Sequence, residues 1–238
     1  MQTIIVGKGR IGMAIAGMAN SPIVISRADP IPDIPGPIIV CTRNDDLDAV
    51  LAKTPRSKLQ DLVFVQNGMI YSWLEKHDLQ NNTQALLYFA VSSIGAVPVD
   101  GGKTVVCGKW AKHFQQLLQE GSIQCRIVDI VSYQLTSIEK FLWICVFGLL
   151  CQRYQCTVSE VVMDHRSDID RLTHELADFV YTQFGLQRPP SLIGDLCSYS
   201  MTIPDYKGAV KEWSWRNGWL VAKKETPVHM KFLQEVGR

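Results

Sequence analysis

The sequence has 238 residues, of which 47% are hydrophobic and 20% are charged, and its formal net charge is +1. This composition is typical of a folded globular protein and excludes an intrinsically disordered chain. The nearly balanced charge and the lack of a Lys/Arg block in the sequence argue against a nucleic-acid partner.

The cysteine pattern and the apolar runs bear on compartment and membrane. Seven cysteines are scattered without a C-x-x-C pair, which predicts reduced thiols, no metal site and a cytoplasmic location. No signal peptide is expected, because the N-terminus leads directly into a strand pattern. The run from Phe141 to Cys151 is the longest apolar one and is too short to span a bilayer, so we expect a buried helix and no membrane partner.

A glycine-rich turn begins the chain. Four apolar residues (3–6) lead into Gly7-Lys8-Gly9-Arg10-Ile11-Gly12, and a helical pattern follows. Glycines at this G-x-G-x-x-G spacing allow a sharp turn, a close approach of the backbone to a pyrophosphate, and tight packing of the helix on the strand. The motif predicts that these six residues bind a dinucleotide, while the alternative is a glycine-rich turn without a ligand.

The first half of the chain alternates between strand-like and helix-like segments, which predicts βαβ units and a Rossmann-like, doubly wound parallel sheet. Segment 29–37 carries four prolines and is expected to be an extended loop in place of a crossover helix. The predicted strands are Thr3–Val6, Ile23–Ser26, Ile38–Cys41, Leu62–Gln66, Ala85–Ala90, Thr104–Cys107 and Cys125–Val128. The predicted helices are Ile11–Ala19, Leu47–Ala52, Met69–Glu75 and Lys109–Gln119.

The second half of the sequence reads as helical throughout. Thr136-Ser137-Ile138-Glu139 has the form of a capping box and is expected to start a helix that ends near Gln152. Further helices are predicted at Val158–Phe184, Tyr206–Lys223 and Val228–Val236. The fold class is therefore α/β, with a dinucleotide-binding domain at 1–131 and an all-helical domain at 132–238.

The end of the second predicted strand bears on the choice of cofactor. Rossmann domains that bind NAD place an acid there for the ribose hydroxyls, whereas this chain has Ser26 and Arg27. A guanidinium beside a hydroxyl suits a 2′-phosphate, which favours NADP(H). The alternatives are that Arg27 is an exposed arginine at a strand end, or that Asp29 still reaches the ribose.

Ordered motifs along nearly the whole length give the chain a resemblance to the ketopantoate reductase family, the NADPH-dependent 2-oxo acid reductases. The resembling segments are Gln66-Asn67-Gly68-Met69, the lysine segment Ser137–Trp143, Ser198-Tyr199-Ser200-Met201, Lys211–Gly218, and Thr226-Pro227-Val228-His229. The resemblance is to a shortened and divergent member. It implies reduction of a small ketone or 2-oxo acid by NADPH.

The resemblance also implies roles for individual residues. Lys140 is expected to be the general acid, Glu212 to bond the substrate or Lys140, Ser200 to bind the substrate's polar end, and Asn67 to lie beside the nicotinamide. Thr42 and Arg43 follow the third strand, where cofactor contacts are implied. If Lys140 lies in the first turn of a capped helix, the helix dipole lowers the pKa of its amine.

Each of these residues has a structural alternative. Lys140 fits a surface lysine in a first helical turn, and Glu212 a solvated helix residue. Ser200 fits a helix N-cap, and Asn67-Gly68 a plain turn. The tryptophans near residue 215 fit packing between domains or subunits, which is compatible with a homodimer.

Some positions depart from the family's pattern. Arg43 stands where the family has a lysine, and Ile144 and Gly148 stand where it has asparagines on the lysine helix. Pro204 occupies the place of an acid, and Asp205 follows it. These changes leave two other hypotheses open: a catalytically inactive NADP(H)-binding sensor or scaffold, and a Rossmann-like interaction module without a ligand.

Overall fold

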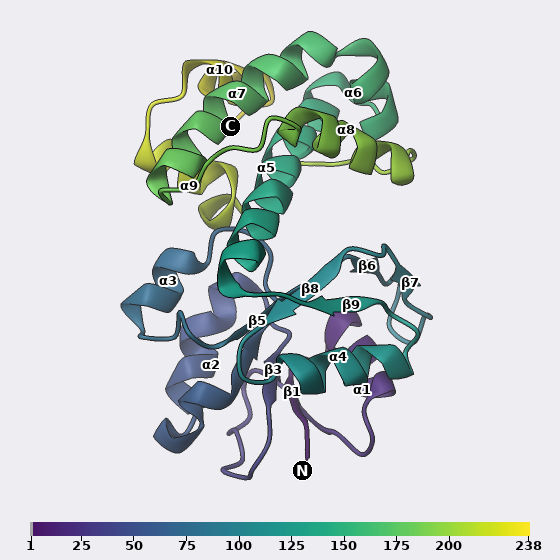
Figure 1. Cartoon of the computed structure of the whole chain (residues 1–238), viewed down its shortest axis with the longest axis vertical. Coiled ribbons are helices and arrows are strands. Elements are labelled where there is room, and N and C mark those ends of the chain that lie inside the picture. The colour runs from purple at the N-terminus through teal and green to yellow at the C-terminus, as the bar shows by residue number, and fades with distance from the viewer. Residues whose placement is uncertain (1) are drawn as a thin grey trace. The chain divides into compact units, whose positions relative to one another are not determined.

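Seven strands in the first part of the chain form one sheet, in the order β2-β1-β3-β4-β5-β8-β9 (Figure 1). The computed structural model describes residues 2–238. Neighbouring strands are parallel except for the antiparallel pair β5 and β8. The strands are β1 (Ile4–Val6), β2 (Ile23–Ile25), β3 (Ile38–Val40), β4 (Leu62–Phe64), β5 (Thr83–Leu86), β8 (Thr104–Cys107) and β9 (Cys125–Ile127).

The chain divides into two compact units, Met1–Tyr133 and Gln134–Arg238. The first contains the sheet and its helices, and the second is helical. The predicted α/β class, with a Rossmann-like, mostly parallel sheet followed by an all-helical part, is therefore confirmed.

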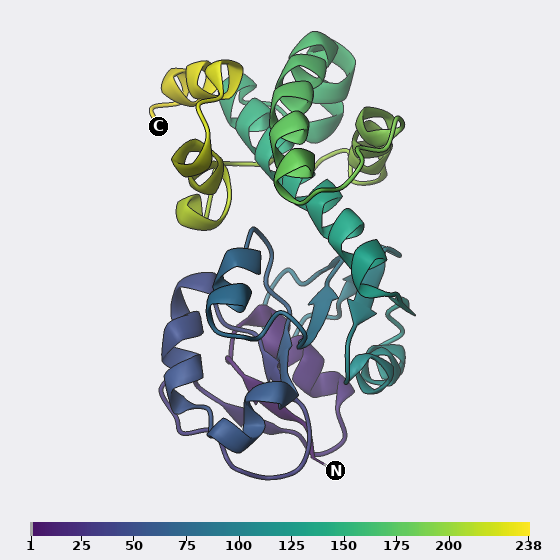
Figure 2. The ribbon, with the colours of Figure 1, turned by 60° about the vertical axis from the view of Figure 1, so that its left-hand side comes forward.

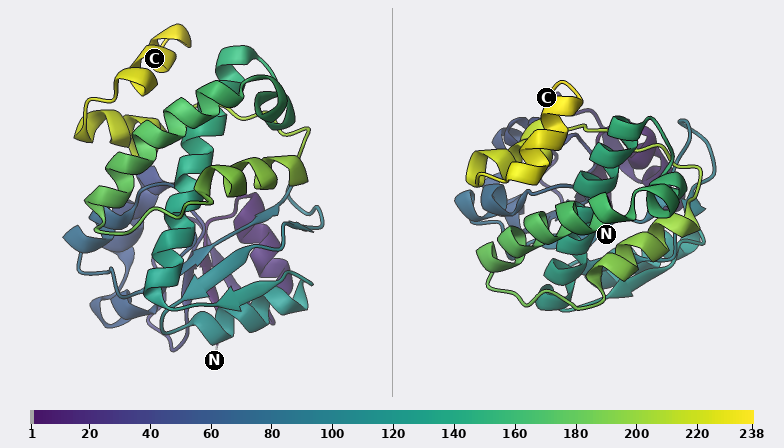
Figure 3. Two further views of the ribbon diagram at one scale, coloured as in Figure 1. Left: turned by 45° about the horizontal axis from the view of Figure 1, so that its top comes forward. Right: turned by 90° about the horizontal axis from the view of Figure 1, so that it is seen from above.

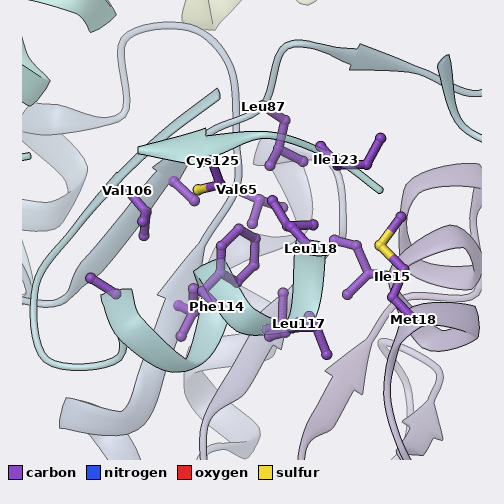
Figure 4. Packing of buried hydrophobic residues seen from close by; sticks show 14 of the residues in the cluster. Ile15, Met18, Val65, Leu87, Val106, Phe114, Leu117, Leu118, Ile123 and Cys125 are labelled. Atoms are coloured by element: carbon purple, nitrogen blue, oxygen red, sulfur yellow. The ribbon is translucent and has the colours of Figure 1, made fainter. Parts of the chain in front are cut away.

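The five central strands of the sheet, β1, β3, β4, β5 and β8, are buried on both faces, as expected for continuous apolar runs. Helices α1 (Arg10–Met18) and α4 (Ala111–Glu120) cover one face. There, Phe114 and Leu118 pack into an apolar cluster with strand side chains such as Val106 of β8 (Figure 4). Burial of each such side chain contributes about 1.5–3 kcal/mol.

Helices α2 (Leu47–Lys53) and α3 (Tyr71–Lys76) lie on the other face (Figure 2). The ring of Trp73 packs edge-on against Phe64 of β4, with 5.9 Å between ring centroids. The sheet is therefore covered on both sides, which is the doubly wound arrangement.

The proline-rich segment 29–37 contains no helix or strand, as predicted. The continuous strand predicted at 85–90 is interrupted after Leu86, where β5 ends and the Tyr88 amide donates to Thr104 Oγ1 at 2.9 Å. A separate antiparallel pair, β6 (Phe89–Ala90) with β7 (Val99–Asp100), follows and was not predicted. The other predicted elements of this unit lie within about two residues of the observed ones.

In the second unit, helices gather around the C-terminal half of α5 (Figure 3). Trp143 of α5 packs edge-on against Tyr199 at 5.0 Å, and Trp219 contacts Phe141 at 5.8 Å and Phe179 at 5.9 Å. The helices are α5 (Ile130–Tyr154), which starts in the first unit, α6 (Val158–Asp164), α7 (Arg166–Gln183), α8 (Leu192–Thr202), α9 (Asn217–Lys223) and α10 (Pro227–Glu235).

Several helix boundaries of this unit differ from prediction. Helix α5 begins at Ile130, so Thr136 lies inside it and caps nothing. The capping box is instead at Thr157. Its side chain accepts a hydrogen bond from the Glu160 backbone amide, and the Glu160 side chain accepts one from the Thr157 backbone amide. The single helix predicted at 158–184 is broken at His165, whose ring stacks on Tyr154 at 3.4 Å.

Two further differences concern the segment from Leu192 to Lys223. Helix α8 was not predicted. The helix predicted at 206–223 is wrong: only a 3-10 turn, η3 (Trp213–Trp215), and α9 are present there. The backbone of Glu212, before η3, has φ 47°, in the left-handed region that interrupts a right-handed helix.

Helix α5 is long and apolar enough to cross a membrane by length and composition alone, and is the one such helix among the described residues. The core helix of a soluble protein passes the same test, and 61% of its most apolar window is buried inside the protein. Its full length of 25 residues exceeds the run at 141–151 that the sequence suggested.

Candidate functional site

The sheet order reverses at β1, which pairs with β2 on one side and with β3 on the other. Ligands of open parallel sheets bind at such a switch point, beyond the carboxyl ends of the strands. Gly7 follows β1 and Cys41 follows β3, so the glycine turn lies at this position. The Cys41 amide donates to the Val6 carbonyl at 2.8 Å and joins the two strand ends.

The three glycines of the turn have different surroundings. Gly7 has φ +117°, and a Cβ there would lie 2.8 Å from the Cys41 carbonyl oxygen. A Cβ on Gly12 would lie 1.9 Å from the Gly7 oxygen, so α1 packs directly on the turn. A Cβ on Gly9 would meet no atom within 4 Å. Gly7 and Gly12 are therefore required by packing, whereas Gly9 leaves open space beside the backbone.

The N-terminus of α1 carries amides without side-chain partners. Gly9 is its N-cap and supplies no side-chain cap, and the first turn contains no acidic residue. Free amides and the helix dipole at such an end favour an anion. Of the other motif residues, Lys8 is exposed and Ile11 packs against the apolar cluster. Arg10 Nη1 donates to the carbonyls of Val91 and Ser92, at 3.3 Å each.

The end of β2 holds Ser26 and Arg27. Arg27 Nη1 lies 2.9 Å from both carboxylate oxygens of Asp46, and its side chain is 63% exposed. The Ser26 amide donates to Asp29 Oδ2 at 2.7 Å. This bond is the main reason that the pKa of Asp29 is lowered, with smaller contributions from Lys8 and Lys53. Asp29 is therefore an ionised carboxylate that closes its own turn.

Polar side chains follow β3 and β4, beside the glycine turn. Asn44 is 4% exposed, and its Nδ2 donates to the Asn67 carbonyl at 2.8 Å. Gln66 Nε2 donates to the carbonyls of Val40 at 2.8 Å and Thr42 at 3.2 Å. Thr42 Oγ1, Gln66 Oε1 and Asn67 Oδ1 are buried without a partner among the described residues. Unsatisfied buried acceptors at this edge fit a ligand that donates hydrogen bonds.

Arg43, which also follows β3, is exposed and precedes the short 3-10 helix η1 (Asn44–Asp46). Sequence reasoning singled out Thr42, Arg43 and Asn67 but missed Asn44 and Gln66. Their position directly after buried strands is the signal that could have found them, because strand ends meet at one edge of a parallel sheet.

In the second unit, Lys140 is 9% exposed and lies in the interior of α5. Burial, and to a lesser extent the nearby positive charge of Arg216, lower the pKa of its amine to about 7. The prediction that Lys140 lies in a first helical turn is wrong, because α5 starts at Ile130. The cause of the lowered pKa is desolvation and a neighbouring cation rather than the helix dipole.

Glu212 is exposed, and its Oε2 forms an ion pair with Arg216 Nη2 at 2.5 Å. The Arg216 side chain is 14% exposed, and its Nε is buried without a hydrogen-bond partner among residues 2–238. Sequence reasoning missed Arg216. An arginine four residues after a glutamate gave no reason to expect burial.

Ser200 is completely buried within α8, so it is not a helix N-cap. Its Oγ accepts a hydrogen bond from Trp143 Nε1 at 2.9 Å and donates to the Leu196 carbonyl at 3.0 Å. The hydroxyl's one proton is therefore used inside the unit, and the expected contact of Ser200 with a substrate stays a prediction. Ser200 holds the Trp143 indole in place.

The other motif residues of this unit support its packing. Asn217 Nδ2 donates to the Cys145 carbonyl at 3.2 Å and lies 3.0 Å from His229 Nε2. Burial lowers the pKa of His229 to about 4, so this imidazole is neutral. The carboxylate of Glu175 accepts the backbone amides of Val228 and His229, at 2.9 and 2.8 Å, and caps α10.

The structure thus groups the predicted residues within each unit. The glycine turn, Thr42 and Asn67 lie at the carboxyl ends of adjoining strands in the first unit. In the second unit, Lys140 and Glu212 share Arg216 as an electrostatic neighbour. Ser200 joins neither group.

No known family model matches the sequence, and no curated protein matches it closely. Solved structures do match. A ketopantoate reductase from Ralstonia eutropha JMP134 aligns over 100% of this chain and 97% of its own, with 14% identity and a TM-score of 0.74. A dimeric ketopantoate reductase from Staphylococcus aureus aligns over 100% and 98%, with 17% identity and a TM-score of 0.72.

A D-mandelate dehydrogenase in complex with NADH aligns over 100% of this chain and 98% of its own, with 14% identity and a TM-score of 0.72. At such low identities, a likeness between structures shows the fold alone. The motif resemblance is confirmed at that level: the chain has the fold of the ketopantoate reductases.

Proposed function

We propose that this protein is an NADP-dependent reductase of small 2-oxo acids. The single observation that carries the proposal is Lys140, a buried amine with a pKa of about 7, in a chain with the fold of ketopantoate reductases. A general acid works best when its pKa lies near the working pH. The mandelate dehydrogenase neighbour, which binds NADH, supports a nicotinamide-dependent reaction.

We assign dinucleotide binding to residues 1–131 and the substrate chemistry to residues 132–238. The open space at Gly9, the uncapped start of α1 and the unpartnered Thr42 Oγ1 and Asn67 Oδ1 fit a dinucleotide. In this assignment the α1 amides bind the pyrophosphate. Lys8 and Arg10 add positive charge, and Asn67 orients the nicotinamide.

NADP(H) is the proposed form of the cofactor, because Arg27 and Ser26 stand at the ribose end of β2. The ion pair of Arg27 with Asp46 is exposed, and such pairs contribute only about 0–1 kcal/mol. A 2′-phosphate can therefore displace Asp46 at little cost. Asp46→Asn is expected to strengthen NADPH binding and Arg27→Ala to weaken it, each relative to NADH, as measured by calorimetry.

The proposed reaction needs a hydride donor and a proton donor. Reduced nicotinamide would supply a hydride to the C2 carbon of the 2-oxo acid. The ammonium of Lys140 donates a proton to the carbonyl oxygen as negative charge develops there. The product is a 2-hydroxy acid, and Lys140 is left as a neutral amine that takes a proton from water. We propose that Glu212 positions the substrate through its ion pair with Arg216.

The experiment is NADPH oxidation across a panel of 2-oxo acids, with Lys140→Met and the matched exposed variant Lys231→Met. Wild type and Lys231→Met are expected to turn over at least one acid, and Lys140→Met to lose roughly a hundredfold or more in kcat. The rate is expected to fall as the pH rises through about 7, because the amine must be protonated. Equal turnover by wild type and Lys140→Met would contradict the proposal.

A second candidate function is NADP(H) binding without catalysis. One observation favours it: a Cβ on Gly148 would lie 3.0 Å from the Ala209 oxygen, so the chain's own backbone covers the place where the resemblance implies an asparagine. This candidate predicts that NADPH raises the melting temperature while no 2-oxo acid is reduced.

We also propose a homodimer in a cytoplasmic setting. The dimeric S. aureus neighbour supports the assembly. On the helical unit, the apolar side chains of Met163, Met201 and Trp213 are 63%, 47% and 38% exposed, which fits a surface that a second copy covers. All seven cysteines are free, which fits a reducing compartment. Sedimentation velocity is expected to give about twice the mass of one chain.

A further inference from the structure

Two side-chain amides join the loops that follow β3 and β4, at the carboxyl edge of the sheet. Asn44, after β3, donates from Nδ2 to the carbonyl of Asn67 at 2.8 Å. Gln66, after β4, donates from Nε2 to the carbonyls of Val40 at 2.8 Å and Thr42 at 3.2 Å. Each side of the junction thus donates to the other, and we call the pair Asn44 and Gln66 the amide clasp.

The amide clasp begins where the strand ladder ends. The last paired residues of β3 and β4 are Val40 and Phe64. Asn44 is 4% exposed and Gln66 is 6% exposed. Because a buried amide without hydrogen bonds is costly, the folded protein favours loop positions in which the clasp is formed. The clasp therefore extends the connection between the two strands into their loops.

The clasp acts on two residues whose side chains lack partners. The carbonyls that accept its bonds include those of Thr42 and Asn67. The side-chain oxygens Thr42 Oγ1 and Asn67 Oδ1 have no hydrogen-bond partner among residues 2–238. Gly68, which follows, has φ +91°, a left-handed conformation that glycine adopts readily. The clasp thus fixes the backbone of both residues, while their side-chain oxygens still lack a donor.

Asn82 makes the same kind of bonds at the opposite edge of the sheet. Its Nδ2 donates to the carbonyls of Leu59 at 2.7 Å and Leu62 at 3.1 Å, and the residue is 2% exposed. Leu62 is the first residue of β4, so these bonds lie at the amino end of the strand. Ligands of parallel sheets bind beyond the carboxyl ends. Asn82 is therefore the internal comparison, a buried amide that supports packing away from the switch point.

The position of the clasp indicates which half of a dinucleotide it faces. At a switch point the cofactor lies across the first strand, with its adenosine half on the side of the second strand. Here β2 lies on one side of β1, and β3 and β4 lie on the other. A dinucleotide whose pyrophosphate binds at α1 therefore has its nicotinamide half over the ends of β3 and β4.

We propose that Asn44 and Gln66 are positioning residues, which hold Thr42 and Asn67 in place to receive the nicotinamide half of the cofactor. The proposal rests on the dinucleotide binding proposed above and adds two residues to it. Neither residue needs to touch the cofactor. Loops that are already ordered lose less conformational freedom on binding, so the clasp strengthens binding of the nicotinamide and fixes the orientation of its ring.

The binding test compares NADPH with 2′-phospho-ADP-ribose, the same nucleotide without the nicotinamide ring. Both are titrated calorimetrically into wild type, Asn44→Leu, Gln66→Met and the matched control Asn82→Leu. The two clasp variants are expected to bind NADPH roughly tenfold more weakly, and to bind 2′-phospho-ADP-ribose within about twofold of wild type. Asn82→Leu is expected to lower the melting temperature, as the clasp variants do, without changing the ratio of the two affinities.

The fluorescence of bound NADPH gives a second readout, which a purely structural role would not move. At saturating NADPH the site is filled in every variant, so time-resolved anisotropy reports how freely the reduced ring moves rather than how tightly the nucleotide binds. Ring motion is expected to be faster in Asn44→Leu and Gln66→Met than in wild type and Asn82→Leu.

These readouts distinguish the clasp from the reductase. The expected pattern of NADPH binding, in a protein that reduces no 2-oxo acid, would support the clasp and contradict the reductase. An unchanged ratio of the two affinities in the clasp variants, or an equal change in Asn82→Leu, would overturn the clasp even in an active enzyme. Wild type that binds neither nucleotide would contradict both. If a clasp variant does not fold, as circular dichroism would show, Asn44→Ser and Gln66→Asn decide by the same ratio.

Discussion

Lys140 carries a structural cost that bears on the chemical role proposed for it. Its amine is buried in α5 beside the cation Arg216, and both conditions disfavour the charged form. The folded protein therefore has an amine that changes protonation near neutral pH. A lysine in water would remain charged there and would be a poor proton donor.

This cost predicts a pH-dependent effect of Lys140→Met on stability. The pKa of the amine is about 7 in the folded protein and 10.5 ordinarily, so the unfolded chain binds more protons between these values. The wild type therefore gains stability as the pH rises from about 7 to about 10. We expect the stability advantage of Lys140→Met to be larger near pH 6 than near pH 10, by roughly 3 kcal/mol.

Urea unfolding at both pH values measures this difference. Lys231→Met is the matched control, because Lys231 is exposed on α10. An advantage of Lys140→Met that is the same at both pH values would show that the amine is not desolvated in the folded protein.

At the scale of the element, the glycines of the β1–α1 turn differ in what surrounds them. Gly12 lets α1 approach the Gly7 carbonyl, whereas Gly9 faces open space. The two glycines look equivalent in the sequence motif. Their different surroundings show that Gly12 is required by packing, and they are the reason that we propose Gly9 for the ligand.

This difference predicts opposite outcomes for two substitutions. Gly12→Ala places a Cβ 1.9 Å from the Gly7 oxygen and is expected to lower the free energy of unfolding by roughly 1–3 kcal/mol. Gly9→Val is expected to leave the melting temperature nearly unchanged and to weaken NADPH binding at least tenfold. Thermal unfolding and calorimetry measure the two effects.

Gly17→Ala is the control on the same helix, because a Cβ there meets no atom within 4 Å. It is expected to stabilise α1 by about 0.5–1 kcal/mol without changing the affinity for NADPH. Full NADPH affinity in Gly9→Val would argue that the turn binds no pyrophosphate.

At the scale of the whole molecule, the chain has two compact units with different chemistry. The first offers backbone amides and unpartnered acceptors at the switch point of a sheet. The second offers a buried amine and a guanidinium. This division is the basis on which we propose that the first unit binds the dinucleotide and the second the acid.

Hydrogen exchange with and without NADPH tests this division. Bound NADPH is expected to slow exchange at residues 7–13, 41–44 and 66–68, because a ligand that binds the folded state opposes local opening. Gly9→Val is expected to remove this protection. Protection at the α1 end that persists in this variant, or that is absent from all three segments of wild type, would contradict the assignment.

The sequence by itself determined most strands of the main sheet, the proline loop and the glycine turn, since these depend on local backbone properties. Apolar runs form buried strands, proline prevents a helix, and glycine alone adopts the φ of +117° at Gly7. The ordered motifs also led to the correct fold.

Only the tertiary structure decided where the helices of the second unit begin and what their polar residues do. Helix α5 starts at Ile130, upstream of the predicted cap. Trp143 bonds Ser200, and the charge of Arg216 acts on Lys140, although the members of each pair lie far apart in the sequence. Local patterns cannot reveal such contacts, because burial and pKa depend on what the remainder of the chain packs around each side chain.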